Sequence, residues 1–381
     1  MISVKHKEKC CGCEACVQVC PHKCITFDED SEGFRYPRVD TARCVQCGLC
    51  EQVCPMYHQP LLSSSPQPFC YQSPEQDVLS NSSSGGLFTA LADKILADNG
   101  IVIGARFNEH WEVEHACATT KESLRPLCTS KYVQSRIGTI FNEVAHYLAA
   151  GRKVLFCGTP CQVAALRRFC RKNAEQLTCV DFICHGVPSP LVWRQWLASA
   201  TQGREIESIT FRSKEKGWHD YSLQIILRNG EKRSFFILDS AFTRAFSANI
   251  ILRPSCYRCQ MRGLHRHSDI TMADFWGMEK LLGRYDDKGV SLTFANTDKG
   301  LQLLDEVGAE KLDYPVDQLV SYNNSYDRQT PTTALRGAFF SRLKARPDSL
   351  PALLEDVTHL SPMRRRYYKI RTFVNNLLGI I

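Results

Sequence analysis

The spacing of apolar residues changes along the chain between a helical period and short runs typical of strands. Apolar residues three and four positions apart predict helices, and apolar runs bounded by turn residues predict strands. The elements expected in the middle of the chain are a helix with Leu87, Leu91 and Ile95 on one face, a strand at Ile101–Ala105, a helix at Ile137–Leu148, and strands at Val154–Cys157 and Cys179–Ile183. Strands that alternate with helices indicate an α/β body.

The next part of the chain predicts strands in direct succession. They lie at Ile206–Arg212, Ser222–Leu227 and Lys232–Phe236, and Asn229-Gly230 is typical of a hairpin turn between the last two. The loop between the first two strands is basic, and we expect it to be solvated. The residues that surround this loop are Arg212, Lys214, Lys216, Trp218 and His219.

Twenty cysteines set this composition apart from that of an ordinary globular protein. Eight of them form two runs with the spacing C-x2-C-x2-C-x3-C-P, which is typical of ferredoxins with two 4Fe-4S clusters. In such a module three cysteines of a run hold one cluster, and the fourth reaches the other cluster. We therefore assign one cluster to Cys10, Cys13, Cys16 and Cys54, and the other to Cys20, Cys44, Cys47 and Cys50.

Zinc sites and disulfides are the alternatives for these cysteines. Structural zinc sites use pairs of C-x2-C, and disulfides belong to oxidising compartments. The first residues, Met1–His6, lack the apolar stretch of a signal peptide, so we expect a cytoplasmic protein with reduced cysteines. Cys11 and Cys24 fit neither ligand set, and we expect both to be buried free thiols.

Further candidate residues follow the ferredoxin module. Ser83-Ser84-Gly85-Gly86 precedes a helix, where free backbone amides suit a phosphate, although such a sequence also serves as a simple cap. Two predicted strands end in Gly158-Thr159-Pro160-Cys161-Gln162 and Cys184-His185-Gly186, and strand ends are where α/β folds bind ligands. Together with the C-x2-C pair Cys256 and Cys259, the strand-end cysteines Cys161 and Cys184 would complete a third 4Fe-4S cluster. A zinc clip, a redox pair or buried thiols are the alternatives.

Five segments in order resemble the coenzyme F(420) hydrogenase/dehydrogenase beta-subunit family. They are Ser83–Gly86, Thr129–Ser135 with Lys131, Gly158–Gln162, Cys184–Gly186 and Asp269–Gly277. The resemblance implies an α+β fold in which FAD binds in the body, close to a third cluster. The residues it places near FAD are Ser83, Ser84, Gly85, Gly86, Lys131, Gly158, Thr159, Pro160 and Gln162. Cys157 adds a thiol to the glycine turn, so either Cys157 or Cys161 would be the cluster ligand.

These observations predict four parts in the 381-residue chain. Residues 1–60 are the ferredoxin module, 66–160 and 161–325 are the N-terminal and C-terminal regions of the beta subunit, and 330–381 are a helical basic tail. Leu350, Leu353, Leu354 and Val357 have helical spacing and are expected to pack on the body or a partner. The segments Arg364–Lys369 and Phe373–Ile381 leave open a peripheral contact with a membrane.

The expected function is electron transfer between the clusters and a two-electron substrate through FAD, because clusters exchange single electrons. A ferredoxin or a larger oxidoreductase subunit is the expected redox partner, and the deazaflavin coenzyme or another small organic molecule is the substrate. His185 and Asp274 are candidates for proton transfer, with a role as hydrogen-bonding loop residues as the alternative. The competing hypotheses are a non-catalytic electron-transfer subunit and a structural iron–sulfur protein. The net charge of +7 carries no inference for nucleic acid, because cluster thiolates offset it.

Overall fold

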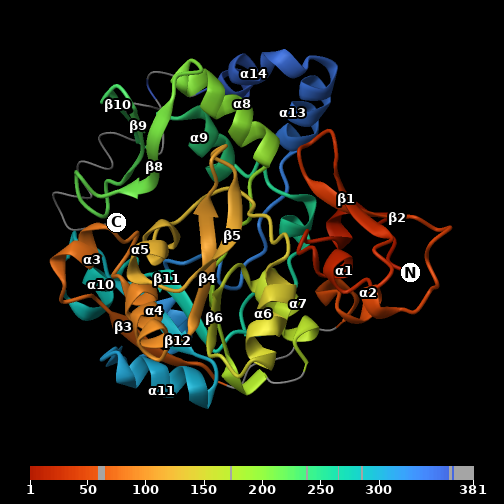
Figure 1. The fold of residues 1–381 in the computed structure, drawn as a ribbon. Coiled ribbons are helices and arrows are strands. Elements are labelled where there is room, and N and C mark those ends of the chain that lie inside the picture. The colour runs from red at the N-terminus through yellow and green to blue at the C-terminus, as the bar shows by residue number, and fades with distance from the viewer. Residues whose placement is uncertain are drawn as a thin grey trace.

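We describe a computed structural model of the chain. It describes residues 1–58, 65–171, 174–236, 239–264, 266–284, 286–359 and 363. A small N-terminal module lies beside a larger body that contains an eight-stranded sheet, and a second, three-stranded sheet lies at one end of that body (Figure 1).

The N-terminal module repeats one local structure twice. Each cysteine run forms a loop that enters a short helix, and the residues before these helices, Glu14 and Gly48, adopt left-handed backbone conformations. An antiparallel hairpin, with Ile25 opposite Val39, connects the two halves. The elements are η1 (Lys7–Lys9), α1 (Ala15–Gln18), β1 (Ile25–Glu29), β2 (Arg35–Val39), α2 (Leu49–Gln52) and η2 (Pro55–Tyr57).

The large sheet has the strand order β13-β3-β12-β11-β7-β6-β4-β5. Its central strands β4, β6, β7 and β11 run parallel, and the outer pairs are antiparallel. Because strands from before and after residue 160 share this sheet, the ranges 66–160 and 161–325 are joined in one structural unit. The strands are β3 (Gln67–Tyr71), β4 (Ile101–Phe107), β5 (Val113–Ala118), β6 (Val154–Cys157), β7 (Leu177–Phe182), β11 (Ile270–Asp274), β12 (Ser291–Ala295) and β13 (Glu310–Lys311).

Helices cover both faces of this sheet, so its central strands are apolar on both sides. Ile101 and Ile103 of β4 pack with α6 (Ile140–Ala149) and α7 (Pro160–Phe169) on one face, together with residues of the N-terminal module. Val102 packs on the other face with α4 (Leu87–Ala97) and α11 (Asp298–Glu306). The remaining helices of the sheet region are α3 (Gln76–Ser80), α5 (Lys121–Leu124), η3 (Arg125–Leu127), η4 (Ala174–Gln176), η5 (Pro254–Arg258), α10 (Met278–Leu282) and α12 (Val316–Leu319).

The three-stranded sheet packs on four helices around a core rich in aromatic residues. Trp193 lies at the centre of this core, stacked on Trp196 and close to Phe211 and Phe242. The elements are β8 (Ile206–Ser213), β9 (Ser222–Leu227), β10 (Lys232–Phe236), α8 (Pro190–Thr201), α9 (Ala241–Ser247), α13 (Ala334–Ala345), η6 (Pro347–Ser349) and α14 (Leu350–Val357).

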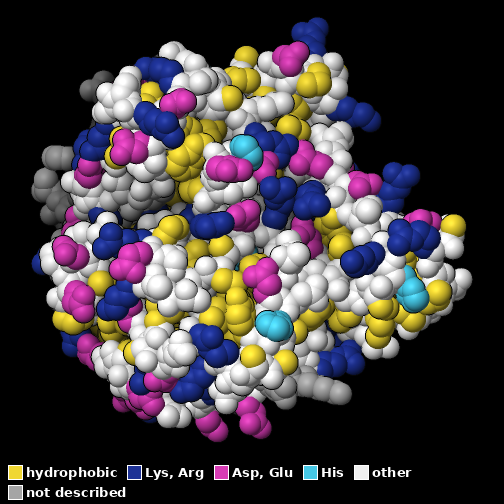
Figure 2. Space-filling view, viewed as in Figure 1, with side chains coloured by type: hydrophobic (Ala, Val, Ile, Leu, Met, Phe, Trp, Pro, Cys, Tyr) yellow, Lys and Arg dark blue, Asp and Glu magenta, His cyan; other side chains and the backbone are white. Residues whose placement is uncertain are grey.

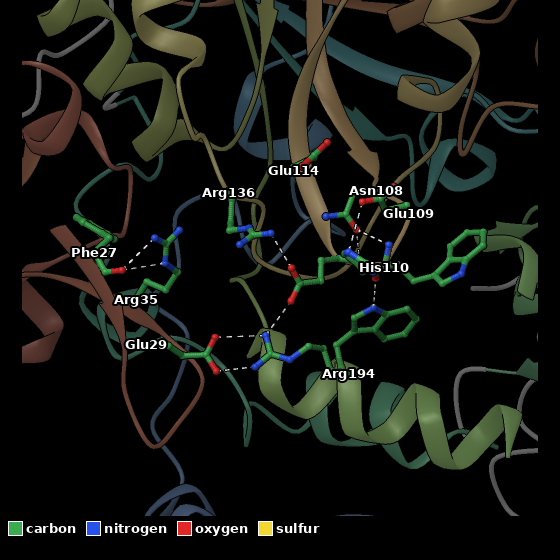
Figure 3. Close-up of polar contacts among 12 residues, drawn as sticks. Phe27, Glu29, Arg35, Asn108, Glu109, His110, Glu114, Arg136 and Arg194 are labelled. Carbon is green, nitrogen blue, oxygen red and sulfur yellow. Dashed lines mark hydrogen bonds and ion pairs between the residues drawn. The ribbon is translucent and has the colours of Figure 1, made fainter. Parts of the chain in front are cut away.

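Ion pairs connect the N-terminal module to the body. Figure 3 shows Arg194 of α8 facing Glu29 of β1, with an Nη2 to Oε1 distance of 2.5 Å. The same guanidinium donates to Glu112, which also accepts a hydrogen bond from Arg136. On the face shown in Figure 2, Lys and Arg side chains are interspersed with Asp and Glu and do not form one continuous basic stripe.

Most of the predicted elements are confirmed, with ends that move by a few residues. The strands Val154–Cys157, Ser222–Leu227 and Lys232–Phe236 have the predicted bounds, and Gly230 has a φ of 82° in the turn between the last two. The apolar residues of α14 pack on α8 and α9, as expected of a helix docked on the body. The predicted basic segment Arg364–Lys369 and the segment Phe373–Ile381 lie outside the described residues. Among the helices that the structure describes, none combines the length and the hydropathy needed to cross a bilayer.

Candidate iron–sulfur sites and an adjoining cavity

The structure brings the two crossed sets of cysteines together. Cys10, Cys13, Cys16 and Cys54 line one small cavity of the N-terminal module, and we call them set one. Cys54 comes from the second cysteine run, and its thiolate and that of Cys10 add to burial in raising the pKa of Cys16. The reciprocal group, set two, lines a second cavity and consists of Cys20, Cys44, Cys47 and Cys50.

Cys11 and Cys24, the two cysteines of the N-terminal module that belong to neither set, are buried, as expected. The Cys24 sulfur lies 3.4 Å from the Cys20 sulfur, and the Cys11 side chain interacts with Cys13. All twenty cysteines fall within the described residues, and none forms a disulfide. No group of three or more described His, Cys, Asp or Glu side chains is arranged around a single metal ion.

A third group of cysteines lies in the body, and we call it set three. It contains Cys161 at the start of α7, Cys184 after β7, Cys256 in η5, and Cys259. Burial, followed by the negative charges of the other three sulfurs, raises the pKa of Cys184 well above its usual value. The backbone amide of Val187 donates to the Cys256 sulfur over 3.4 Å. Four half-buried thiols that act on one another therefore have the composition of a cluster site.

Cys157 does not join set three. Burial raises its pKa to about 12, and the charged groups that act on it are Asp181 and Lys131. Cys161, in contrast, interacts with Cys11 of the N-terminal module, and its charge acts on Cys184, Cys256 and Cys259. Of the two cysteines in the glycine turn, the structure thus groups Cys161 with the other three.

A cavity of ≈ 570 Å³ adjoins set three, and Cys184 is part of its wall. It lies where β6, β7 and β11 end, next to the start of α4, and its volume is within the range of cofactor pockets. Seven of the nine residues expected near FAD line this cavity. They are Ser83, Ser84, Gly86, Lys131, Gly158, Thr159 and Gln162.

The other two expected residues, Gly85 and Pro160, do not line the cavity and support it from behind. The Gly85 amide donates to Ser291 Oγ over 3.1 Å, and a side chain on Gly85 would meet the backbone of β3 and β12. Pro160 is buried at the first position of α7, where its fixed φ suits a helix start.

Lys216 of the loop after β8 is exposed, as its sequence suggests, but Arg212 at the end of β8 and Trp218 in the loop are buried. Arg212 is 4% exposed and forms an ion pair with Asp274, with an Nη1 to Oδ2 distance of 2.7 Å. Its guanidinium also lies 3.9 Å from the centre of the Tyr221 ring. Trp218 is buried and stacks on Trp276 at 4.5 Å. Because a buried charge needs a partner, this pair forms a fixed polar wall of the cavity.

Two buried bases in the cavity wall have strongly shifted pKa values. Burial lowers the pKa of Lys131 to about 7, and its Nζ donates to the carbonyl oxygens of Pro126 and Thr129. Burial likewise lowers the pKa of His115 to about 4, so this imidazole is neutral near pH 7. Its Nε2 lies 3.1 Å from the Cys157 carbonyl oxygen and must therefore carry the hydrogen. Its Nδ1 is then an acceptor, and it has no partner among the described residues.

Comparisons with known proteins address the resemblance seen in the sequence. Residues 151–314 match the family described as the C terminus of the coenzyme F420 hydrogenase/dehydrogenase beta subunit, and residues 9–57 match a 4Fe-4S dicluster domain. Residues 151–314 therefore belong to the coenzyme F420 hydrogenase/dehydrogenase beta-subunit family. The chain thus combines a 4Fe-4S dicluster domain with a domain of an oxidoreductase family.

A solved structure has a similar fold over most of the chain. A chain in the F420-reducing NiFe hydrogenase complex from Methanosarcina barkeri is similar to this chain, with 16% sequence identity and a TM-score of 0.50. The similarity covers 74% of this chain and 93% of that chain. The comparison with curated proteins gave no match.

The matched beta-subunit domain contains all of set three and both proposed proton-transfer residues. His185 and Asp274 line the cavity. His185 Nδ1 lies 3.2 Å from Ser325 Oγ, and burial lowers the pKa of His185. His115 and Tyr221, which the sequence motifs did not indicate, also line the cavity. The apolar alternation of Val113–Ala118 would have placed His115 on a buried face of a strand.

Proposed function

We propose that this chain is an FAD-dependent iron–sulfur oxidoreductase that passes electrons between its clusters and a two-electron substrate. The observation that carries the proposal is the position of set three. Cys161 interacts with Cys11 of the N-terminal module, and Cys184 is part of the cavity wall. A cluster held by Cys161, Cys184, Cys256 and Cys259 would therefore connect the ferredoxin clusters to whatever binds in the cavity.

The cavity has the properties that a flavin site needs. Its volume is ≈ 570 Å³, and its wall combines apolar side chains with fixed polar groups. The acceptor Nδ1 of His115 and the Nε of Arg212 are buried and lack partners among the described residues, so each can bond to a bound molecule. Bound FAD would supply the conversion between single electrons and a hydride.

Residues of this chain would hold the FAD in place. The start of α4 presents backbone amides beside Ser83, Ser84 and Gly86, and such a helix N-terminus attracts phosphate. Burial alone lowers the pKa of Lys131 to about 7, and a bound phosphate would favour its charged form. Gly158 and Thr159 leave room at the end of β6. Gln162 donates to Ser135 Oγ over 3.0 Å and so fixes this turn.

His185 and Asp274 have different parts in this proposal. His185 is buried and its pKa is lowered, so the neutral imidazole can accept a proton at the cavity wall. Asp274 is already paired with Arg212 and accepts a hydrogen bond from Trp218 Nε1 over 3.3 Å. We propose that His185 moves a proton and that Asp274 positions Arg212.

The substrate in this proposal is the deazaflavin coenzyme or another small organic acceptor, and the partner is a ferredoxin or a larger oxidoreductase subunit. Cys47 of set two is exposed, which makes set two the accessible point for single electrons. The similar chain of known structure comes from a hydrogenase complex, which favours a second candidate function. In that function the chain is a non-catalytic electron-transfer subunit docked on a larger enzyme.

The test is anaerobic reconstitution followed by iron and flavin analysis. We expect about twelve irons per chain and a flavin absorbance, because three cubanes contain four irons each. Cys161→Ser should lose about four irons, and the matched variant Cys157→Ser should lose none. About eight irons without flavin in the unmodified protein would refute the proposal. Bound flavin that no hydride donor or acceptor reduces or oxidises would favour the docked subunit instead.

A further inference from the structure

Arg253 is a buried arginine between the N-terminal module and the beta-subunit domain. It is 1% exposed, and it precedes η5, the short helix that carries Cys256. Its Nε donates to the Cys10 carbonyl oxygen over 2.8 Å, and its Nη2 donates to the Arg35 carbonyl oxygen over 2.9 Å. A cation that is removed from water so completely needs compensating negative charge nearby.

The compensating charge comes from cysteines of two different sets. Arg253 Nη2 lies 3.5 Å from the Cys10 sulfur, which belongs to set one. The charge of Arg253 also acts on Cys256 and Cys161, which belong to set three. No carboxylate forms an ion pair with Arg253 in the described part of the chain. The sulfur ligands are therefore the main negative groups that this guanidinium faces.

Close packing fixes the guanidinium in this position. Arg253 Nη1 donates to Gln134 Oε1 over 3.0 Å, and the guanidinium lies 4.4 Å from the centre of the Tyr36 ring. Gly12, inside the first cysteine run, has a φ of 72°, and a Cβ there would lie 2.7 Å from Arg253 Nη1. The backbone of the cysteine loop thus packs directly against the guanidinium and restricts its movement.

We infer that Arg253 sets the reduction potentials of two clusters, the one held by set one and the one held by set three. For set three, this inference rests on the third cluster of the proposed function. A cluster gains one negative charge when it is reduced, and a nearby positive charge or N–H to sulfur bond favours that state. One electron leaves the reduced first cluster, which is oxidised, and reduces the third cluster. Arg253 stabilises the extra electron on both clusters, before and after this step. It therefore acts through the clusters and touches no substrate.

The test is a redox titration of the reconstituted full-length protein, followed by EPR. Arg253→Met removes the charge and keeps the length of the side chain. We expect two of the three midpoints to fall, each by at least a tenfold change in the ratio of reduced to oxidised cluster, or about 59 mV for one electron. The midpoint of the cluster held by set two should stay unchanged. Because the site is buried, the shifts should persist at high ionic strength.

Arg43→Met is the matched control. Arg43 is an exposed arginine near set two, and its Nη2 donates to the His22 carbonyl oxygen over 2.9 Å. The same loss of charge there should leave the two Arg253-dependent midpoints unchanged, because water and salt screen an exposed charge. Equal shifts in both variants would overturn the inference, since they would reflect net charge alone.

Arg253→Lys keeps the inference testable if Arg253→Met fails to load its clusters. Lysine retains the charge but not the planar fork that reaches Cys10. We therefore expect a lower midpoint for the first cluster and little change for the third. A third midpoint that falls as far in this variant as in Arg253→Met would overturn the inference, because the charge that acts on set three is retained. If Arg253→Met contains about twelve irons and its midpoints do not shift, the inference is refuted and the proposed function is not. If the unmodified protein contains only about eight irons, the third cluster is refuted.

Discussion

Gly85 is the position where a single methyl group should have a large effect. It lies between the ends of β3 and β12, where Tyr71 is paired with Ser291. A Cβ built on Gly85 would lie 2.7 Å from the Ser291 backbone nitrogen and closer still to the Tyr71 carbonyl oxygen. Both neighbours are backbone atoms, so no flexible side chain can move aside. Gly85→Ala must therefore separate the loop from the two strands.

The cost follows from the contacts that such a separation breaks. Overpacking in a well-packed core costs about 1–3 kcal/mol. The Gly85 amide bond to Ser291 Oγ and the Ser73 amide bond to the Gly85 carbonyl oxygen are also weakened, and each contributes about 0.5–1.5 kcal/mol. We expect a loss of about 2–5 kcal/mol in the free energy of unfolding. In a unit of this size that lowers Tm by on the order of 10 °C in an anaerobic thermal scan at fixed rate.

Gly337→Ala is the matched control for the same chemical change. Gly337 lies inside α13 and is exposed, and no heavy atom lies within 4 Å of an added Cβ. Alanine is favoured over glycine in a helix by about 1 kcal/mol, so Tm should stay the same or rise. If Gly85→Ala and Gly337→Ala have the same Tm, the close backbone approach at Gly85 does not limit stability and the reasoning is wrong.

Two further predictions concern a buried base and the attachment of the N-terminal module. Burial lowers the pKa of His115 to about 4. Between pH 6.5 and 4 this histidine is therefore protonated in the unfolded chain but neutral in the folded chain, and the free energy of unfolding rises with pH across this window. Thermal scans at pH 6.5 and pH 5 should show that His115→Gln removes roughly 2 kcal/mol of this dependence, and an equal dependence in both proteins would contradict the assignment. The Glu32–Arg336 pair is 17% and 16% exposed, whereas Glu29–Arg194 is 35% and 34% exposed. Double-mutant cycles on unfolding should therefore give about 1 kcal/mol or more for the first pair and less for the second, and the reverse order would show that burial does not control the coupling.

The cysteine sets of the N-terminal module could be predicted because their information is local. Three cysteines at two-residue spacing place one loop around three corners of a cubane, and the repeat of the run specifies the crossed fourth ligand. Set three is different, because Cys161, Cys184 and the pair at Cys256 and Cys259 come from separate elements. The sequence indicated candidates for this group, but the choice between Cys157 and Cys161 depended on how the turn after β6 packs.

The basic loop after β8 shows where local patterns fail. Arg212 belongs to a run of polar residues, which is typical of a solvated loop. Its carboxylate partner Asp274 lies 62 positions further along the chain, at the end of β11. A contact between residues so far apart leaves no periodic pattern in the sequence. The ion pair lets Arg212 be buried in the cavity wall, where its sequence predicts an exposed charge. The inner strands β3 and β12 were missed for a related reason, since their burial depends on neighbours from distant parts of the chain.

The arrangement of the three sets implies an order for electron transfer. In set two Cys47 is exposed, whereas Cys184 of set three is part of the wall of the cavity. Set one shares the N-terminal module with set two, and Cys11, the neighbour of Cys10 in the first cysteine run, interacts with Cys161 of set three, which would make set one the middle step. An electron that enters near Cys47 would then pass set one before it reaches the cavity, and Arg253 lies at the junction between the second and third positions. Arg336 pairs with Glu32 of the N-terminal module and donates to the carbonyl oxygen of Leu252, the residue before Arg253, so this half-buried ion pair attaches the module to the body beside the junction.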